Sequence, residues 1–159
     1  MTNRYSSGGF ELFVGIALGL LVSVANAQGI TAADIDRARF KVSTKGTDGK
    51  WTSRETDRVP LTPGEACYNW GLHLSKTPPG DVAWTEELEI PAKPAIWQHS
   101  DKFELSKERT VAVTKKSQTP KDGWISHGWC VAKGDPAGRY VIKVYVGEGL
   151  AKTFEFFVE

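Results

Sequence analysis

Apolar and polar side chains alternate along most of this chain with a period of two residues, and this alternation limits the fold more than any other feature. In residues 66–74, Tyr68, Trp70 and Leu72 are separated by smaller or more polar residues. Such spacing buries one face of an extended strand and leaves the other face near solvent. An apolar stripe with the 3.6-residue spacing of a helix is not sustained anywhere after residue 36. Strands are therefore expected to dominate the domain.

Turn-forming residues divide the alternating segments into short strands. Asp-Gly, Pro-Gly and Gly-x-Gly sequences occur at 48–49, 63–64, 79–80 and 147–149, and such sequences favour tight turns. We expect one helical turn near residues 31–34, a loop or short helical turn over 102–110, and inward-facing Val111 and Val113. The expected strands cover residues 38–43, 51–59, 66–74, 82–90, 110–115, 124–131, 140–146 and 150–158. About seven or eight strands without intervening helices predict an all-β, antiparallel sandwich.

The first 27 residues have the order of a secretory signal peptide. A basic start with Arg4 is followed by an apolar run at 12–25 and then by Ala25-Asn26-Ala27, which fits the small-residue rule for cleavage. The run is shorter than the about 20 residues that span a bilayer, although an uncleaved anchor is the alternative. We expect residues 28–159 to form a single periplasmic or secreted domain with no stable membrane span after cleavage.

Cys67 and Cys130 are the two cysteines of the chain. Two cysteines in an exported protein suggest one disulfide bond. A 67–130 bond closes a loop of about 64 residues, for which chain entropy predicts about 4 kcal/mol of stabilisation. A catalytic thiol is the alternative, but neither cysteine has neighbours that would activate a thiolate.

The C-terminal third resembles a known fold family. The stretch 135–144, Asp-Pro-Ala-Gly-Arg-Tyr-Val-Ile-Lys-Val, resembles the penultimate strand of immunoglobulin-like domains, in which a corner Tyr hydroxyl bonds to the preceding backbone. The resemblance is to immunoglobulin-like β-sandwich domains of bacterial exported proteins of unknown function, and is strongest in residues 123–159. It implies structural corner roles for Asp135, Gly138 and Tyr140. Cys130 precedes the corner, so the antibody disulfide is not implied, and the fold itself implies no function.

Net charge gives no sign of a nucleic-acid partner. Lys and Arg total 20 and Asp and Glu total 19, for a formal charge of +1, whereas nucleic-acid binding domains carry a basic surplus. The expected partner is an envelope protein or a cell-surface polymer.

No catalytic motif is present in the chain. It lacks the G-x-S-x-G motif, and Ser126 and His127 are neighbours in a strand, where side chains point to opposite faces. Glu86, Glu87 and Glu89 are expected to form a solvated face. The expected function is therefore non-catalytic, with a hydrolase that has an unrecognised site as one alternative.

The three histidines, His73, His99 and His127, define a second alternative, a small metal-binding protein, because imidazole suits Cu and Zn. They lie in three separate segments. His73 shares a strand face with Cys67, and His127 lies opposite Cys130, so a 67–130 bond would not bring these two histidines together. We expect no cofactor.

Six tryptophans are the least ordinary feature of the composition. Trp70 and Trp129 have the spacing of core residues. Trp51, Trp84 and Trp97 lie among polar residues or after a proline, and an exposed platform of these three would suit a sugar ring or a peptide. Packing at the rim of the core is the alternative. The leading hypothesis is an exported binding module for an envelope protein or a cell-wall or sugar ligand.

Overall fold

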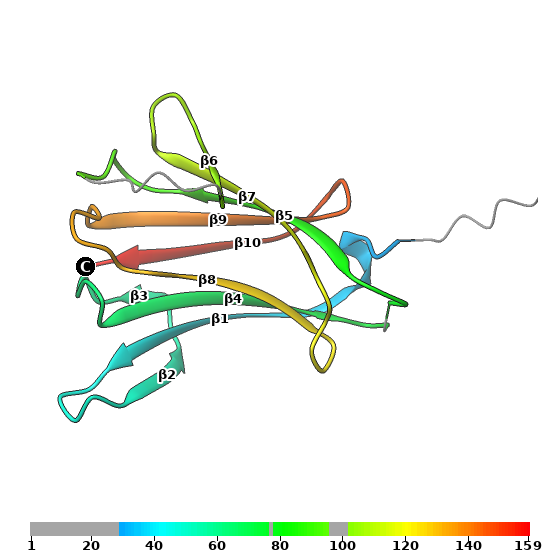
Figure 1. Cartoon of the computed structure of the whole chain (residues 1–159), viewed down its shortest axis with the longest axis horizontal. Coiled ribbons are helices and arrows are strands. Elements are labelled where there is room, and N and C mark those ends of the chain that lie inside the picture. The colour runs from blue at the N-terminus through cyan, green and yellow to red at the C-terminus, as the bar shows by residue number, and fades with distance from the viewer. Residues whose placement is uncertain (1–28, 77, 96–101) are drawn as a thin grey trace, which may run out of the picture.

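The computed structural model describes residues 29–76, 78–95 and 102–159, which form two packed β-sheets (Figure 1). The expected signal peptide, Trp97 and His99 lie outside these residues. The four-stranded sheet has the order β2-β1-β4-β8, with β2 (Trp51–Glu55), β1 (Ile35–Lys45), β4 (Ala66–Leu74) and β8 (Trp124–Cys130). The six-stranded sheet has the order β3-β10-β9-β5-β7-β6, with β3 (Arg58–Val59), β10 (Gly149–Val158), β9 (Gly138–Val146), β5 (Val82–Glu89), β7 (Val111–Gln118) and β6 (Glu104–Leu105).

The predicted all-β sandwich is confirmed. All strand pairs are antiparallel except β3 with β10. The ten strands exceed the expected seven or eight mainly because β3 and β6, of two residues each, are included. A 3-10 turn over Ala32–Asp34 precedes β1, and Thr31 and Asp34 cap it. Within the described residues, no helix is long and apolar enough to cross a membrane.

The core lies between the inner faces of the two sheets, as the alternation predicts. Trp70, Leu72 and Ile125 of the four-stranded sheet and Ile142 and Phe156 of the six-stranded sheet are fully buried. The rings of Tyr68 and Phe156 are 4.7 Å apart between centroids, within the range of favourable aromatic pairs. Burial of these large side chains supplies most of the free energy that stabilises the packing of the two sheets.

The inward face of β7 differs from the prediction. Ala112 and Thr114 are buried, whereas Val111 and Val113 lie on the outer face and are partly exposed. Leu88 and Glu86 are the cross-strand partners of Ala112 and Thr114. The small Ala112 and Thr114 leave room for these larger neighbours, so packing, rather than the greater hydrophobicity of valine, determines the register.

The disulfide and the tyrosine corner are both present. Cys67 and Cys130 are cross-strand partners in β4 and β8 and form the disulfide. The hydroxyl of Tyr140 donates a hydrogen bond to the carbonyl of Pro136 at 2.8 Å, and the ring is buried. Gly138 has φ 135°, a conformation that favours glycine. The Asp135 carboxylate accepts a 2.8 Å hydrogen bond from the backbone N–H of Ala132.

Candidate functional site

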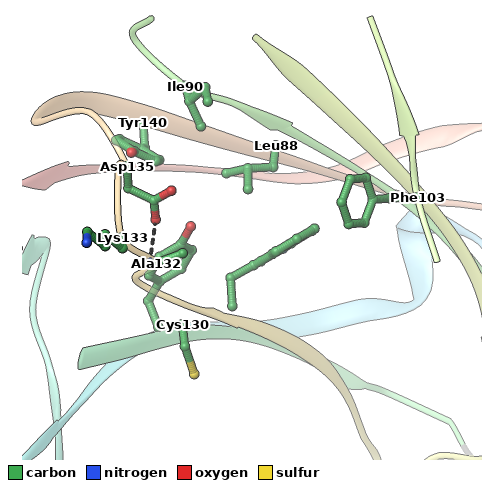
Figure 2. A pocket seen from close by; sticks show the side chains of 10 residues that line it. Leu88, Ile90, Phe103, Cys130, Ala132, Lys133, Asp135 and Tyr140 are labelled. Atoms are coloured by element: carbon green, nitrogen blue, oxygen red, sulfur yellow. Dashed lines mark hydrogen bonds between the residues drawn. The ribbon is translucent and has the colours of Figure 1, made fainter. Parts of the chain in front are cut away.

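A cavity of about 300 Å³ lies between the two sheets, where the end of β8 approaches β5 and β9 (Figure 2). Its walls come mostly from apolar and aromatic side chains, as is usual for ligand sites. In Figure 2, Leu88 and Phe103 point into the space from different segments, while Cys130 and Ala132 border it from the β8 side. The lining residues are Tyr68, Leu88, Ile90, Phe103, Trp129, Cys130, Ala132, Lys133, Asp135 and Tyr140.

Asp135 is the acidic group of the cavity wall. Burial raises the pKa of this carboxyl, and the hydrogen bond from the Ala132 backbone lowers it by less. Tyr140, whose pKa burial also raises, already donates its hydroxyl hydrogen to Pro136. Asp135 therefore places a partly desolvated carboxyl group beside an apolar cavity, a setting enriched at functional sites.

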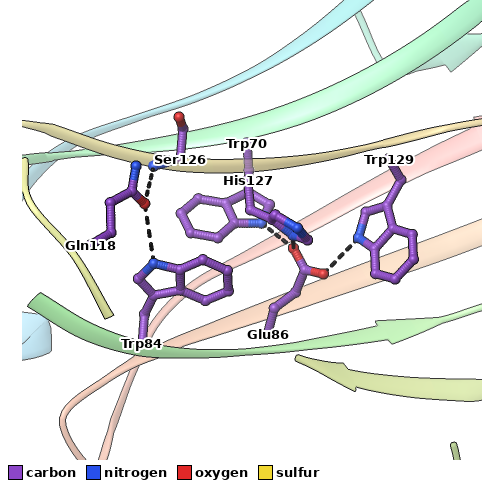
Figure 3. A network of polar contacts seen from close by, with 7 residues as sticks. All are labelled: Trp70, Trp84, Glu86, Gln118, Ser126, His127 and Trp129. Carbon is purple, nitrogen blue, oxygen red and sulfur yellow. Dashed lines mark hydrogen bonds and ion pairs between the residues drawn. The ribbon is translucent and has the colours of Figure 1, made fainter. Parts of the chain in front are cut away.

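Trp129 connects the cavity to a fully buried carboxylate, that of Glu86 (Figure 3). The Nε1 atom of Trp129 donates a hydrogen bond to Oε1 of Glu86 at 2.6 Å. The indole N–H of Trp70 donates to Oε2, and Nδ1 of His127 lies 3.1 Å from the same oxygen. Because a carboxylate only accepts, Nδ1 of His127 carries the hydrogen in this contact. The expected solvated face is thus wrong for Glu86.

The Glu86 network joins the two sheets. Glu86 belongs to β5 of the six-stranded sheet, whereas Trp70 lies in β4, and His127 and Trp129 lie in β8, of the four-stranded sheet. An uncompensated buried carboxylate would cost several kcal/mol, and three donors offset that cost here. The network fixes the indole plane of Trp129, and with it one wall of the cavity.

Trp84 does not belong to an exposed platform. It is buried, and its ring packs edge-on against Trp70 with the ring centroids 5.1 Å apart. Its Nε1 donates to Oε1 of Gln118 at 3.2 Å. Trp51 is 47% exposed on β2, and Trp97 lies outside the described residues. The prediction of a platform of three tryptophans is therefore wrong for Trp84. This residue lies at one of the alternate positions of β5 whose side chains face the core.

The edge of β8 beside the cavity has backbone groups without a partner among the described residues. The N–H of Ser126 points away from β4, because it donates to Oε1 of Gln118 at 3.3 Å. Backbone direction alternates along a strand, so the N–H and C=O groups of Gly128 and Cys130 also point away from β4. Both residues are exposed, and these groups have no partner among the residues that the structure describes.

The described histidines are not brought together. His73 lies on the outer face of the four-stranded sheet, where its Nδ1 is 2.7 Å from Oδ1 of Asp36. This hydrogen bond is the main cause that lowers the pKa of Asp36. His127 is opposite Trp70 in the register and faces inward. In residues 29–76, 78–95 and 102–159, no group of three or more His, Cys, Asp or Glu side chains has the arrangement of a metal site.

Sequence reasoning missed Glu86 as a functional candidate. Its signal was present in the run Trp84-x-Glu86-x-Leu88-x-Ile90, in which strict alternation puts the glutamate on the apolar face. Phe103, Gln118 and Ala132 were also missed, and no motif marks them, because their roles depend on contacts between segments distant in the sequence.

Comparisons with known proteins find a matching family model and similar solved structures. The model of the PM0630 beta sandwich domain matches residues 38–159, and no curated protein sequence matches the chain. An immunoglobulin-like protein (PA1606) from Pseudomonas aeruginosa superimposes with a TM-score of 0.52 at 16% identity, covering 79% of this chain and 94% of that one. The PmoD soluble domain from a Methylocystis species gives 0.41 at 14% identity, covering 76% and 90%.

Proposed function

Because the chain belongs to the PM0630 beta sandwich domain family, and an immunoglobulin-like fold specifies no chemistry by itself, we propose a function from the geometry of the site. The domain is an exported, non-catalytic binding module that takes up an extended segment of an envelope protein along the edge of β8. The segment adds a strand to the four-stranded sheet, and one of its apolar side chains enters the cavity.

The observation that supports this function is that the backbone groups of Gly128 and Cys130 beside the cavity have no partner among the described residues. A strand that pairs with this edge receives main-chain hydrogen bonds. Its side chains alternate between the outer face and the gap between the sheets. The cavity, lined by Trp129, Cys130 and Ala132 of the same edge, lies where an inward side chain would point. Backbone pairing would give affinity, and the cavity would give specificity.

The other described sheet edges fit this function less well. The edge strands β3 and β6 have two residues each, too short for a stable added strand. The edge strand β2 is five residues long and wholly exposed, but its residues do not line the cavity. Only β8, among the described edges, combines free backbone groups with the cavity.

The cavity favours an aliphatic or aromatic side chain. Leu88, Ile90, Phe103 and Trp129 surround it with apolar atoms, and burial of such a side chain contributes about 1.5–3 kcal/mol. Export of the domain is supported by the Cys67–Cys130 disulfide, because such bonds persist in oxidising compartments. Mass spectrometry of the natively expressed protein should find Gln28, or its cyclised form, at the N-terminus; retention of Met1 would contradict export with cleavage.

Selection from a random peptide library displayed on phage tests the binding function directly. The bait is the domain over residues 28–159, and the negative selection uses the Ala132→Trp variant. Ala132 is exposed and lines the cavity, so we expect an indole at this position to fill the cavity mouth without disturbing the core. Ala137→Trp is the matched control, because Ala137 is exposed in the same loop but does not line the cavity.

Synthetic versions of the selected peptides should share an apolar residue and should bind the wild type and Ala137→Trp equally. Ala132→Trp should weaken binding at least about tenfold, from loss of one buried side chain. In amide NMR spectra, the N–H signals of Gly128 and Cys130 should shift and gain protection from exchange. Peptides that bind Ala132→Trp as well as the wild type, or that leave both amides unchanged, would refute strand addition at β8.

A further inference from the structure

The outer face of the four-stranded sheet carries a row of cations along β1. The inner side chains of β1, such as Val42, face the core, so the alternate residues face outward. These are Arg37, Arg39, Lys41, Ser43 and Lys45, and all but Ser43 are cationic. Side chains two positions apart on one strand face are about 7 Å from each other. The row therefore extends along the face for about 27 Å, eight residues at about 3.4 Å each. It lies on the opposite side of the sheet from the cavity.

Three of these four cations form no ion pair with a described residue, whereas Arg139, Arg58 and Lys115 of the other sheet do; Lys143 of that sheet also has no ion pair among the described residues. Arg37 is 3.9 Å from Asp36, but Arg39, Lys41 and Lys45 form no ion pair with any described residue. On the outer face of the six-stranded sheet, by contrast, Arg139 lies 2.8 Å from Glu155, Arg58 lies 3.0 Å from Glu159, and Lys115 lies 3.9 Å from Glu104. Among the described residues, Asp36 and Glu55, the cross-strand partner of Lys41, are the acids of the β1 face, so the row keeps a positive surplus.

Two guanidinium groups of this row are held in place over one ring. The Cζ atom of Arg39 lies 3.8 Å from the centroid of the Trp124 ring, and that of Arg37 lies 5.5 Å from it. Gly71 makes this stacking possible, since a Cβ there would lie 3.1 Å from Nε of Arg39 and 3.2 Å from the Trp124 ring. A stacked arginine has lost much of its freedom before binding, so it loses less entropy when it meets an anion.

The opposite end of the row has an exposed aromatic ring. Trp51 is the cross-strand partner of Lys45, lies on the same outer face and is 47% exposed. A flat indole ring is a suitable surface for the apolar face of a sugar. Among the residues that the structure describes, the face has no other exposed large hydrophobic side chain, because Leu150 and Phe157 belong to β10 in the other sheet. A membrane-binding surface needs a larger apolar area than one ring.

We propose that this face binds an acidic polysaccharide, with acidic groups of the polymer paired to Arg37, Arg39 and Lys41 and a sugar ring packed on Trp51. The linear row suits a linear polymer that carries negative charges along its length. The indole favours a saccharide over an acidic polypeptide. This surface is independent of the β8 edge and its cavity, so each function can be lost without the other.

Calorimetric titration with alginate oligosaccharides, a polyuronate, tests the assignment. The variants are Arg39→Gln with Lys41→Gln, and the charge-matched control Arg139→Gln with Lys115→Gln on the other sheet. The first pair should bind at least about tenfold more weakly, because two charge-assisted contacts are lost, and the control pair should stay within about twofold. Trp51→Ala should also weaken binding, whereas Ala132→Trp should bind as the wild type does. Thermal unfolding should show that each variant folds; if Arg39→Gln disturbs Trp124, Lys41→Gln with Lys45→Gln replaces that pair.

The comparison ligands are poly-L-glutamate and vesicles of phosphatidylglycerol. Weaker binding of both than of alginate supports the polysaccharide. Equal losses in the β1 and control pairs would show a response to net charge alone and overturn the assignment. The assignment would also be overturned if polyglutamate bound as tightly as alginate, or if the protein bound vesicles alone. The same holds if Trp51→Ala bound alginate as tightly as the wild type, or if the wild type did not bind alginate.

Discussion

Trp129 and Glu86 are hydrogen-bonded across the gap between the two sheets, with the indole N–H of one 2.6 Å from a carboxylate oxygen of the other. The same Trp129 ring forms a wall of the cavity and meets Phe103 at 5.3 Å between ring centroids. A buried acid thus determines the shape of a site that it does not line.

Glu86→Leu should lower the free energy of unfolding by about 3–5 kcal/mol, because the indole N–H groups of Trp70 and Trp129 and the Nδ1–H of His127 lose their acceptor. Urea unfolding followed by tryptophan fluorescence measures the change. Glu89→Gln, at an exposed position of the same strand, should change stability by less than about 0.5 kcal/mol. A Glu86→Leu protein as stable as the wild type would show that the network does not hold the sheets.

Removal of the disulfide by Cys67→Ala with Cys130→Ala should cost about 2–5 kcal/mol, because the bond joins residues 63 positions apart and restricts the unfolded chain. Thermal unfolding with and without reductant measures this cost. The wild type should become less stable in reductant, and the double variant should not respond. Equal stability of the oxidised wild type and the double variant would refute the expectation.

Tyr140→Phe should lower stability by about 0.5–1.5 kcal/mol, since the half-buried Pro136 carbonyl loses the hydroxyl that donates to it. Tyr145→Phe provides the comparison, because its hydroxyl meets Glu87 at 3.2 Å near the surface, and this change should cost less. Chemical denaturation gives both values. Peptide binding at β8 should survive Tyr140→Phe; binding lost without any loss of stability would mean that the hydroxyl contacts the ligand.

Asp135→Asn should stabilise the domain at neutral pH. Burial raises the pKa of Asp135 in the folded state, so the folded state holds this proton more tightly than the unfolded chain does. The stability that proton binding at Asp135 contributes is fully present below the unfolded-state pKa of about 4. It is lost as pH rises through the folded-state pKa. Thermal unfolding between about pH 3.5 and pH 7 should therefore show an Asn variant that is more stable at pH 7 and equal to the wild type in acid.

The Asn side chain keeps an oxygen that can accept the Ala132 N–H bond, so this change isolates the charge. Glu108→Gln, at an exposed carboxyl, controls for general charge effects. Parallel pH profiles for the wild type and Asp135→Asn would contradict the expectation.

The parts of the structure that depend on local sequence were predictable. Tyr140 follows a Pro-x-Gly turn and begins a strict alternation, so both its burial and its hydroxyl partner follow from its position. The pairing of Cys67 with Cys130 follows from their number. The first feature can be predicted from one short segment, and the second from the number of cysteines.

The parts that depend on packing between distant segments were not predictable. Glu86 stands among other acids, so its charge predicts exposure, whereas the donors that make its burial tolerable come from β4 and β8. Hydrophobicity alone predicts that Val111 and Val113 face inward, but the size of Leu88 and Glu86 favours Ala112 and Thr114 there. Such choices depend on which side chains meet, and a single sequence does not contain that information.

The Glu86 network also determines the distance between the two sheets. Near Phe40 and Phe156, whose ring centroids are 4.7 Å apart, contacts are apolar and tolerate sliding. At the β5–β8 side, hydrogen-bond lengths vary only within a few tenths of an ångström, so the reach of one glutamate side chain fixes the spacing. Relatives that replace Glu86 with a shorter or longer acceptor should therefore have cavities of different width and accept side chains of different size.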